Sequence, residues 1–369
     1  MRDSPFITLY KLSLVFFFSY LTTFTITRKA MQTSDHVCDL PLAESYRALL
    51  YDPKMVQKYP YNQDHEVTRE CELPLIDLSG LRSSDGEERR VCIEAIGKAS
   101  SEWGFFQVLN HGISNELLGE MRREQMKLFR LPFEKKVSSR LLNDCYRWGN
   151  PTAISLKQFS WSEAFHVPLA KISDENCCYG EFSSLREVME KLAAAMSELA
   201  HTLAGVLAQN LGYNRHGFPE NCNKSTCFLR LNRYPPCPFS QKAFGLMPHT
   251  DSDFLTILYQ DQVGGLQLMK DSEWVAVRPN PDALFVNIGD LFQAWSNDIY
   301  KSVEHKVVAN GKRERYSIAY FFCPSYDSTI GSCKEPSLYK SFTFGEFRKQ
   351  VQEDVKRCGQ KVGLPRFLL

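Results

Sequence analysis

The chain has 369 residues, which is long enough for one large domain or two modest ones and for a sizeable hydrophobic core. Hydrophobic residues make up 43% of it and charged residues 24%, values that argue against collagen-like, solenoid and largely disordered chains. Lysine and arginine number 44 against 43 acidic residues, so no overall field attracts nucleic acid or an anionic membrane surface, and neither is expected as a partner of the folded core.

The N-terminal stretch carries an ambiguous targeting pattern. Between residues 6 and 27 the only charge is Lys11, and residues 12–20 are nearly all apolar, which resembles a signal anchor. No small-residue cleavage site follows, and Met31 offers a second start just downstream. We expect residues 1–34 to be an extension, with a signal anchor as the alternative, and we expect the core in the cytoplasm, with the nucleus as a second compartment.

The 12 cysteines are scattered along the chain and do not form the framework of a small secreted protein. Cys177 with Cys178, and Cys222 with Cys227, lack the doubled Cys-x-x-Cys spacing of a zinc site. We therefore expect free, structural thiols.

The front half, up to about residue 221, shows mainly helical periodicity. The expected elements are strands at 75–78 and 105–109 and helices at 84–103, from 114 or 115 to about 128, and at 184–212. Two capping boxes, Ser84 with Glu87 and Ser184 with Glu187, mark the beginning of the first and third helices. The apolar spacing of these helices indicates packing rather than chemistry.

The back half changes to alternating periodicity. Eight short strands separated by turn residues are expected at 228–234, 245–251, 254–260, 266–269, 274–277, 283–288, 303–308 and 315–322. About eight evenly spaced strands favour a sandwich or a double-stranded jelly roll. A last amphipathic helix ends at Gly359 and is expected to pack outside the barrel.

Together these patterns predict an α+β fold with a jelly-roll core, flanking N-terminal helices and a C-terminal helix. We expect four parts: an extension and lead-in at 1–60, a mainly helical region at 61–220, the jelly-roll core at 221–330, and a C-terminal helix and tail at 331–369.

Two of the eight histidines stand out because of their strand positions. On the expected strand at 245–251, His249 and Asp251 point to the same face, since strand side chains alternate. His305 lies on a later strand with an alternating pattern. Two imidazoles and one carboxylate on one face of a barrel form the triad that holds non-haem Fe(II) and leaves three neighbouring positions open. A lone His-x-Asp also occurs by chance, so this prediction needs support from other motifs.

Such support comes ten residues after His305. Arg315 and Ser317 share one face of the next strand, where a planar guanidinium fork and a hydroxyl suit a carboxylate. The strand around them is apolar or aromatic, so the arginine needs an anionic partner. Tyr234, at the end of an earlier strand, could donate to the same ligand.

In combination, these motifs resemble the plant 2-oxoglutarate- and Fe(II)-dependent dioxygenases. The likeness runs from about residue 73 to the carboxyl end and appears in a fixed order, which is far more specific than any single motif. It comprises Trp-Gly-Phe-Phe at 103–106, Asn-His-Gly at 110–112, Asn-x-Tyr-Pro-Pro-Cys at 232–237, His-x-Asp at 249–251, Gly-Gly-Leu-Gln at 264–267, Asn-Ile-Gly-Asp at 287–290, His305, and Arg-x-Ser at 315–317.

The resemblance implies that His249, Asp251 and His305 ligate Fe(II). It also implies that Arg315 and Ser317 bind the distal carboxylate of 2-oxoglutarate, with Tyr234 assisting. Oxygen is the second co-substrate and ascorbate the expected reductant. His111, although it lies in a family motif, is interpreted as structural.

Within the family, the chain is most similar to the gibberellin 2-oxidases, and among them to the group that acts on C20 precursors. Residues 146–149, 160–168 and 246–254 carry this likeness. The implied reaction is 2β-hydroxylation of a gibberellin, which removes precursors of the active hormone. Tyr146 and Arg147 are candidate substrate anchors, although an exposed loop pair would explain them equally well.

Three other functions stay open. The same chemistry could act on a flavonoid or another small plant metabolite, or the jelly roll could bind a ligand without turnover. A zinc hydrolase could use the histidines and the aspartate, but it has no use for a carboxylate clamp at Arg315 and Ser317. The sequence does not indicate an oligomeric state.

Overall fold

The computed structural model describes residues 41–46, 69–138, 141–150, 153, 158–213, 222, 225–238 and 244–369. All of them belong to the unit that spans Cys38–Leu369. The predictions made for residues 1–34, including the signal anchor, lie outside the described residues. Within the described ranges, no helix is both long enough and apolar enough to cross a membrane.

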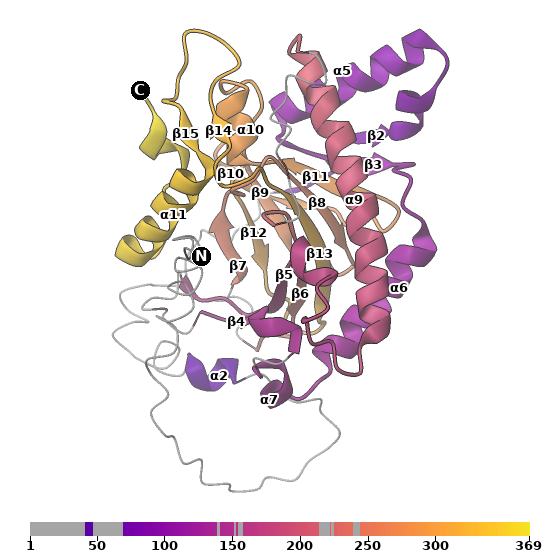
Figure 1. The fold of residues 1–369 in the computed structure, drawn as a ribbon, viewed down its shortest axis with the longest axis vertical. Coiled ribbons are helices and arrows are strands. Elements are labelled where there is room, and N and C mark those ends of the chain that lie inside the picture. Colours follow the sequence, from indigo (N-terminus) through magenta and orange to yellow (C-terminus); the bar gives the residue numbers. More distant parts are fainter. Residues whose placement is uncertain are drawn as a thin grey trace, which may run out of the picture. The chain divides into compact units, whose positions relative to one another are not determined.

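Two β-sheets lie at the centre of the fold (Figure 1). The larger sheet has the strand order β2-β3-β11-β8-β13-β6-β5-β4. Its strands are β2 (Leu75–Asp77), β3 (Phe105–Leu109), β4 (Tyr146–Trp148), β5 (Glu163–Pro168), β6 (Phe228–Tyr234), β8 (Leu255–Gln260), β11 (Leu284–Ile288) and β13 (Arg315–Phe322). The smaller sheet has the order β1-β10-β9-β12-β7. Its strands are β1 (Arg69–Cys71), β7 (Phe244–His249), β9 (Leu266–Lys270), β10 (Glu273–Val277) and β12 (His305–Val308).

The chain passes repeatedly from one sheet to the other, because β6, β8, β11 and β13 belong to the larger sheet and the intervening β7, β9, β10 and β12 to the smaller. A hydrophobic cluster joins the sheets face to face, with Phe105, Tyr234 and Phe285 from the larger sheet and Leu268 and Val307 among its members from the smaller. Two packed sheets connected in this way form a jelly roll. The predicted α+β jelly-roll fold is therefore confirmed.

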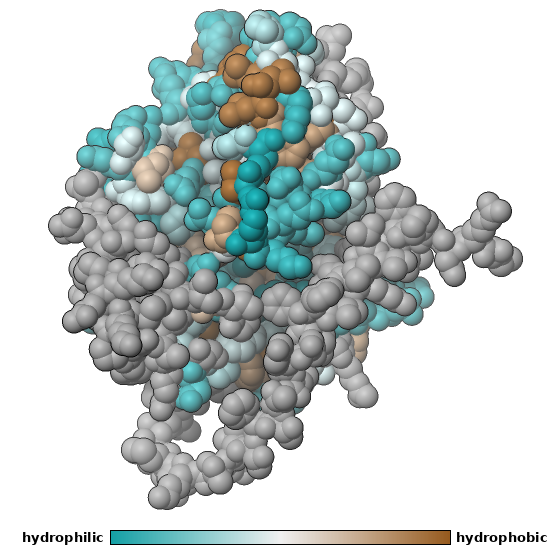
Figure 2. All heavy atoms as spheres, turned by 90° about the vertical axis from the view of Figure 1, so that its left-hand side faces the viewer, coloured by the Kyte–Doolittle hydropathy of each residue, from teal (hydrophilic) through white to brown (hydrophobic). Residues whose placement is uncertain are grey.

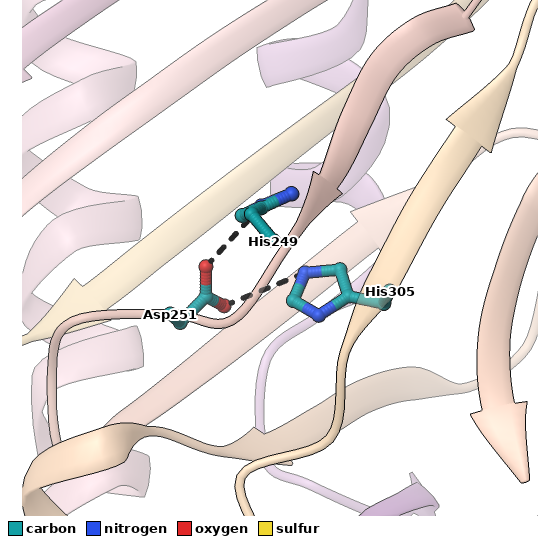
Figure 3. A group of neighbouring side chains, drawn as sticks. All are labelled: His249, Asp251 and His305. Carbon is teal, nitrogen blue, oxygen red and sulfur yellow. Dashed lines mark ion pairs between the residues drawn. The ribbon is translucent and has the colours of Figure 1, made fainter. Parts of the chain in front are cut away.

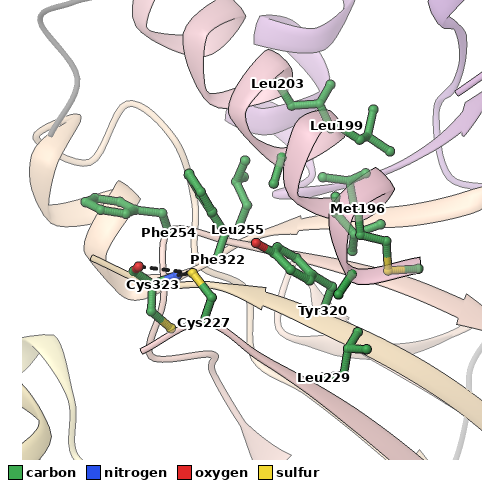
Figure 4. Packing of buried hydrophobic residues seen from close by; sticks show 14 of the residues in the cluster. Met196, Leu199, Leu203, Cys227, Leu229, Phe254, Leu255, Tyr320, Phe322 and Cys323 are labelled. Carbon is green, nitrogen blue, oxygen red and sulfur yellow. Dashed lines mark hydrogen bonds between the residues drawn. The ribbon is translucent and has the colours of Figure 1, made fainter. Parts of the chain in front are cut away.

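Helices cover the outer face of the larger sheet, the face turned away from the smaller sheet (Figure 1). They are α5 (Gly86–Glu102), α6 (Asn115–Phe129) and α9 (Ser183–Asn210). Met196, Leu199 and Leu203 of α9 lie over apolar side chains of the sheet (Figure 4). Each fully buried side chain of this size contributes about 1.5–3 kcal/mol, so this layer stabilises the packing of the helices on the larger sheet.

The C-terminal part of the chain lies on the opposite side of the two sheets (Figure 1). It comprises β14 (Thr329–Ile330), β15 (Phe342–Thr343) and α11 (Phe344–Cys358). Among the described residues seen from this side, hydrophilic ones predominate, and hydrophobic ones gather mainly near the top of the view (Figure 2). Helix α11 ends at Gly359, whose φ of 76° is left-handed and suits glycine, as the sequence predicted.

Several predicted strands agree with the structure residue by residue, namely 105–109, 228–234 and 315–322. The front half supplies to the larger sheet the two predicted strands, β2 and β3, but also two strands that the sequence did not predict, β4 and β5. The register shows how they fit: β5 pairs with β6 along its whole length, and β4 pairs with β5. Short strands with few β-branched residues, such as β4, give a weak alternating signal.

Both predicted capping boxes are wrong. The carboxylate of Asp85, not the Ser84 hydroxyl, accepts the N–H of Glu87 at the beginning of α5, because a carboxylate there also interacts favourably with the helix dipole. Helix α9 has no side-chain cap. The Ser184 hydroxyl instead donates to Glu124 on α6, so a tertiary contact replaces the local one.

Candidate metal centre and co-substrate site

His249, Asp251 and His305 converge at one end of the smaller sheet (Figure 3). His249 is the last residue of β7 and His305 the first of β12, and the two residues lie opposite each other in the antiparallel pair. Asp251 Oδ1 lies 3.6 Å from His249 Nε2, and Asp251 Oδ2 lies 3.8 Å from His305 Nε2. One ligand atom of each residue lies within 4.8 Å of the others, close enough for one metal ion to contact all three.

The sequence predicted that His249 and Asp251 meet because they share one face of a strand. The residues do meet, but this reason is wrong. The strand ends at His249, so Asp251 lies in the following loop rather than two positions along the strand. The loop is fixed by its backbone, because the N–H of Asp290 donates to the Asp251 carbonyl oxygen at 2.9 Å.

Both imidazoles are oriented by the backbone. The Nδ1 of His249 lies 2.8 Å from the carbonyl oxygen of Met247, and the Nδ1 of His305 lies 3.1 Å from that of Val303. Since a carbonyl oxygen only accepts, each Nδ1 must carry the proton, which leaves the lone pair of each Nε2 free. An edge-on contact with Phe105, with ring centroids 5.2 Å apart, also restrains His305. This is the tautomer and orientation that a metal-binding histidine needs.

The Asp251 carboxylate is held in a similar way. Its Oδ2 accepts hydrogen bonds from the Thr256 hydroxyl at 2.6 Å and from the Asn287 amide at 2.8 Å. These donors come from β8 and β11 of the larger sheet, so both sheets contribute to the centre. The bonds on Oδ2 leave Oδ1 for a metal ion, and they explain the asparagine of the Asn-Ile-Gly-Asp motif.

The ionisation states also suit a metal site. Burial and the neighbouring His305 imidazole lower the pKa of His249, which keeps its ring neutral. Burial raises the pKa of Asp251, but the two histidines and the hydrogen bonds from Thr256 and Asn287 outweigh it, so the pKa is lowered overall and the group is a carboxylate. Neutral imidazoles and an ionised carboxylate are the ligand forms that bind a divalent cation.

A second buried carboxyl group lies nearby but differs in charge. Burial and the charge of Asp251 raise the pKa of Asp253 well above its ordinary value, so Asp253 is the protonated member of the pair. Its Oδ2 shares the Thr256 hydroxyl with Asp251. Gly289 leaves room for it, since a Cβ there would lie 2.1 Å from Asp253 Oδ1. Asp253 therefore helps to fix the Thr256 hydroxyl that donates to Asp251.

Arg315 is the most unusual buried residue on the inner face of the larger sheet. It is 2% exposed, and its Nη2 donates to Gln260 Oε1 at 2.6 Å, while Nε and Nη1 have no hydrogen-bond partner among the described residues. The guanidinium carbon lies 4.9 Å from the centre of the Tyr234 ring. A buried cation with unsatisfied donors is costly unless an anion completes it. The clamp therefore has the donors that a small carboxylate needs.

Ser317 and Tyr234 lie next to Arg315, as the sequence predicted. Tyr234 is the partner of Arg315 across β6 and β13, and Ser317 is two positions further on the same face. The Asn232 amide donates to Ser317 Oγ at 3.3 Å, which leaves the serine proton free to donate. Hydroxyl, phenol and guanidinium thus line one strip of the inner face.

The two predicted substrate anchors point to opposite faces of the larger sheet. Arg147 shares a cross-strand row with Ala164, Asn232 and Ser317, so it lies on the inner face. The Tyr146 hydroxyl instead donates to Glu163 at 2.6 Å on the outer face. Tyr146 is therefore committed to a structural hydrogen bond, and Arg147 remains the candidate anchor of the pair.

Sequence reasoning missed an arginine on the inner face. Arg230 lies in the row of His166 and Ala319, and its Nε donates to Asn232 Oδ1 at 2.8 Å. Among the described residues it forms no ion pair with a carboxylate. Arg230 lies two residues before the Asn-x-Tyr motif, and no motif includes it. Only the alternation of side chains along the strand, which puts Arg230 and Asn232 on the same face, could have indicated its position.

Beside Arg230 lies a stack of partly buried aromatic rings. The rings of His166 and Phe228 have centroids 3.9 Å apart at 22°, and those of Phe228 and Phe321 lie 4.3 Å apart at 11°. Burial and the charges of Arg230, Arg348 and Arg147 lower the pKa of His166 to about 3. Stacked rings beside arginines that form no ion pair with a carboxylate of the described residues can bind a flat or ring-shaped molecule that carries a carboxylate.

Iron and 2-oxoglutarate fit these residues. The triad offers two imidazole nitrogens and one carboxylate oxygen, the donor set of non-haem Fe(II) sites. The unsatisfied donors of Arg315 offer a buried partner for the distal carboxylate of a diacid.

Comparisons with known proteins agree with this chemistry. Residues 225–324 match the 2OG-Fe(II) oxygenase superfamily, and residues 73–197 match the N-terminal region described as non-haem dioxygenase in morphine synthesis. The chain is 58% identical over 350 residues to gibberellin 2-beta-dioxygenase 6 of Oryza sativa subsp. japonica, which covers 90% of this chain and 97% of that protein. It is 56% identical over 337 residues to gibberellin 2-beta-dioxygenase 8 of Arabidopsis thaliana, covering 89% and 98%.

A solved structure shows the same relationship. The crystal structure of JOX2 in complex with 2OG, Fe and JA matches 77% of this chain and 85% of its own, with 33% identity and a TM-score of 0.64. The predicted resemblance is therefore confirmed, and this chain belongs to the 2-oxoglutarate- and Fe(II)-dependent oxygenase superfamily as a 2-oxoglutarate-dependent dioxygenase.

Proposed function

We propose that this chain is a gibberellin 2-beta-dioxygenase that hydroxylates C20 precursors in preference to C19 hormones and so lowers the supply of active gibberellin. The observation that carries the proposal is the similarity over 90% of the chain to a gibberellin 2-beta-dioxygenase at 58% identity. The C20 preference rests on the likeness of residues 146–149, 160–168 and 246–254 to that group.

In this proposal His249, Asp251 and His305 ligate the iron, and Arg315, Ser317 and Tyr234 hold the distal carboxylate of 2-oxoglutarate. When bound, Fe(II) supplies the oxidising chemistry, in which 2-oxoglutarate and O2 yield succinate and CO2 while one oxygen atom enters a substrate C–H bond. The chain itself needs no acid or base for this reaction; its side chains bind, orient and exclude water.

The inner face of the larger sheet supplies the substrate surface. A gibberellin is a rigid apolar ring system that bears carboxylates, so it needs apolar walls and a few cationic anchors. The stack of His166, Phe228 and Phe321 offers the walls, and Arg230 and Arg147 offer the cations. Thr256, cross-strand partner of Phe321, donates to Asp251, which places the stack in the row that leads to the metal centre.

Three further expectations extend the proposal. Ascorbate serves as the reductant that keeps the iron ferrous. The reaction takes place in the cytoplasm, with the nucleus as a second compartment, and cell fractionation tests this. The helical region at 61–220 and the jelly-roll region at 221–330 act as one catalytic unit, because both contribute strands to the larger sheet.

The test is an assay of purified protein with Fe(II), 2-oxoglutarate and ascorbate against three substrates: a C20 gibberellin, a C19 gibberellin and a flavonoid. Succinate release coupled to a product one oxygen atom heavier, fastest with the C20 compound, supports the proposal. Turnover of the flavonoid alone selects the alternative substrate class. Absence of turnover with all three indicates a binding protein.

A variant sharpens the substrate part. Arg230→Gln should raise KM for a carboxylated gibberellin about tenfold to a hundredfold, since one charge-assisted hydrogen bond contributes about 1.5–3 kcal/mol, and it should leave KM for 2-oxoglutarate unchanged. The methyl ester of the same gibberellin is the matched control, because the substitution should not affect it. An equal KM for the acid in both proteins would remove Arg230 from the substrate site.

A further inference from the structure

The C-terminal tail reaches the metal centre through one lysine. Lys361 follows the end of α11, and its Nζ donates to the carbonyl oxygen of Thr250 at 2.9 Å, although the two residues are 111 positions apart. Thr250 is the residue between His249 and Asp251. The tail therefore bonds to the backbone of the loop that carries two of the three candidate ligands.

Asp290, the first residue of α10 (Asp290–Trp295), completes the contact. Its Oδ2 lies 2.6 Å from Lys361 Nζ and accepts from the Thr250 hydroxyl at 3.3 Å. Its Oδ1 accepts from the Ser302 hydroxyl at 2.7 Å, and Ser302 precedes β12, which begins at His305. One carboxylate thus links the tail, the loop after β7 and the segment that leads to the third ligand.

This contact is buried and closely packed. The Lys361 side chain is 12% exposed and that of Asp290 is 4% exposed, so solvent screens the pair little. The ammonium lies 5.6 Å from the centre of the Phe347 ring of α11. At Gly363 the tail backbone has a φ of 73°, and a Cβ there would lie 3.2 Å from Asp290 Oδ2. Phe347 of α11 and the tail backbone at Gly363 therefore both restrict the position of the lysine side chain.

The charges explain why both partners are needed. A positive charge next to His249 opposes both protonation of the ring and binding of a dication. Asp290 neutralises that charge at 2.6 Å, so the lysine can hold the loop without repelling a metal ion. A hydrophobic side chain would fill the space but would leave the Thr250 carbonyl oxygen and the Asp290 carboxylate without this donor.

We propose that Lys361 is a positioning residue for the metal centre: with Asp290 it holds the His249–Asp251 loop in the geometry that binds iron. The C-terminal tail then contributes to the geometry of the metal centre through contacts with the Thr250 carbonyl oxygen and the Asp290 carboxylate. The inference rests on the metal-site part of the proposed function and is independent of which substrate is oxidised.

The experiment measures the affinity of the full-length protein for Mn(II), in the presence of 2-oxoglutarate and the absence of O2. The titration follows the electron paramagnetic resonance signal of free Mn(II). The variants are Lys361→Met and the double variant Lys361→Met with Asp290→Asn, with Lys349→Met on the exposed face of α11 as control. All titrations are made well below the unfolding temperature of each protein. We expect both Lys361 variants to bind Mn(II) about tenfold more weakly, as for other groups that orient metal ligands, and the control to match the unchanged chain.

The single variant leaves the buried Asp290 carboxylate without its ammonium partner, which could prevent folding. The double variant removes this charge as well, and it still lacks the hydrogen bond to the Thr250 carbonyl oxygen. It therefore tests the proposal even if the single variant does not fold. A purely structural role would lower the unfolding temperature and leave Mn(II) affinity unchanged, and that result would overturn the inference. If the unchanged chain itself does not bind Mn(II), the metal-site assignment fails instead, and with it the basis of this proposal.

Discussion

The two faces of the larger sheet bury polar groups in opposite ways. On the outer face, Glu163 accepts from Lys136 and Tyr146 at 2.6 Å each and from Arg233 at 2.7 Å, so each of its two carboxylate oxygens has a close partner. On the inner face, two donors of Arg315 have no hydrogen-bond partner within the described part of the chain. The comparison teaches that Glu163, with both oxygens paired inside the protein, has a structural role, whereas the unsatisfied donors of Arg315 suit an anionic ligand.

The largest effect is expected at the metal centre. His305→Ala removes one of three candidate ligands, so turnover should fall at least about a thousandfold, because the chemistry depends on the bound metal. The ring is buried and contacts Phe105, so the unfolding temperature should fall as well, and turnover is therefore compared for the folded fraction. His201→Ala on α9, away from the centre, is the control. Substantial activity in His305→Ala would remove His305 from the iron site.

On the outer face the expected loss is in stability rather than catalysis. Lys136→Met leaves the Glu163 carboxylate with less compensation in a fully buried place, so the free energy of unfolding should fall by about 3–5 kcal/mol. Chemical denaturation at pH 7 measures this, and the exposed Lys135→Met is the control. The kcat of the folded fraction should not change. A loss of stability below about 1 kcal/mol would mean that the ion pair of Lys136 and Glu163 does not stabilise the fold, which would contradict the structural role given to the outer face.

At the clamp the expected effect is smaller and confined to the co-substrate. Arg315→Lys replaces a planar fork by a point charge, so KM for 2-oxoglutarate should rise about tenfold to a hundredfold. Steady-state kinetics at saturating gibberellin measure it, with the exposed Arg313→Lys as control. An unchanged KM would show that the unsatisfied donors of Arg315 do not bind 2-oxoglutarate.

The smallest effect concerns His166, whose pKa is lowered to about 3 by burial and by the surrounding arginines. Because this value lies below that of the unfolded chain, about 6.5, the neutral ring stabilises the fold fully above pH 6.5 and progressively less as the pH falls below it. His166→Gln should therefore make stability less dependent on pH between about 3 and 6.5. Thermal unfolding across this range measures the change, and an unaltered pH dependence would contradict the lowered pKa.

Substrate binding offers a second measurement on the same residue. A carboxylated gibberellin that neutralises Arg230 should raise the pKa of His166, and NMR titration of the imidazole detects this. The methyl ester should not raise it. Equal titration with acid and ester would mean that no carboxylate binds beside the arginines.

The sequence predicted the jelly roll and the identity of the candidate ligands, because strand periodicity and ordered motifs are local signals. It could not predict how Asp251 reaches the histidines, since that depends on the loop after β7. Arg230 was missed because no motif marks it and its orientation follows from register with β5 and β13. The bond from Lys361 to Thr250 joins distant segments, and no local pattern reveals such a contact. Ser184 shows the reverse case, in which a tertiary partner replaces a plausible local cap.

The central claim is that three side chains hold one iron next to a buried clamp for 2-oxoglutarate. The most direct measurement is an anaerobic titration of Fe(II) into the protein with 2-oxoglutarate, following the charge-transfer absorption that arises when the keto acid chelates the metal. We expect saturation at one iron per chain and loss of the band in His249→Ala. No band in the unchanged protein, or an equal band in the variant, would contradict the account.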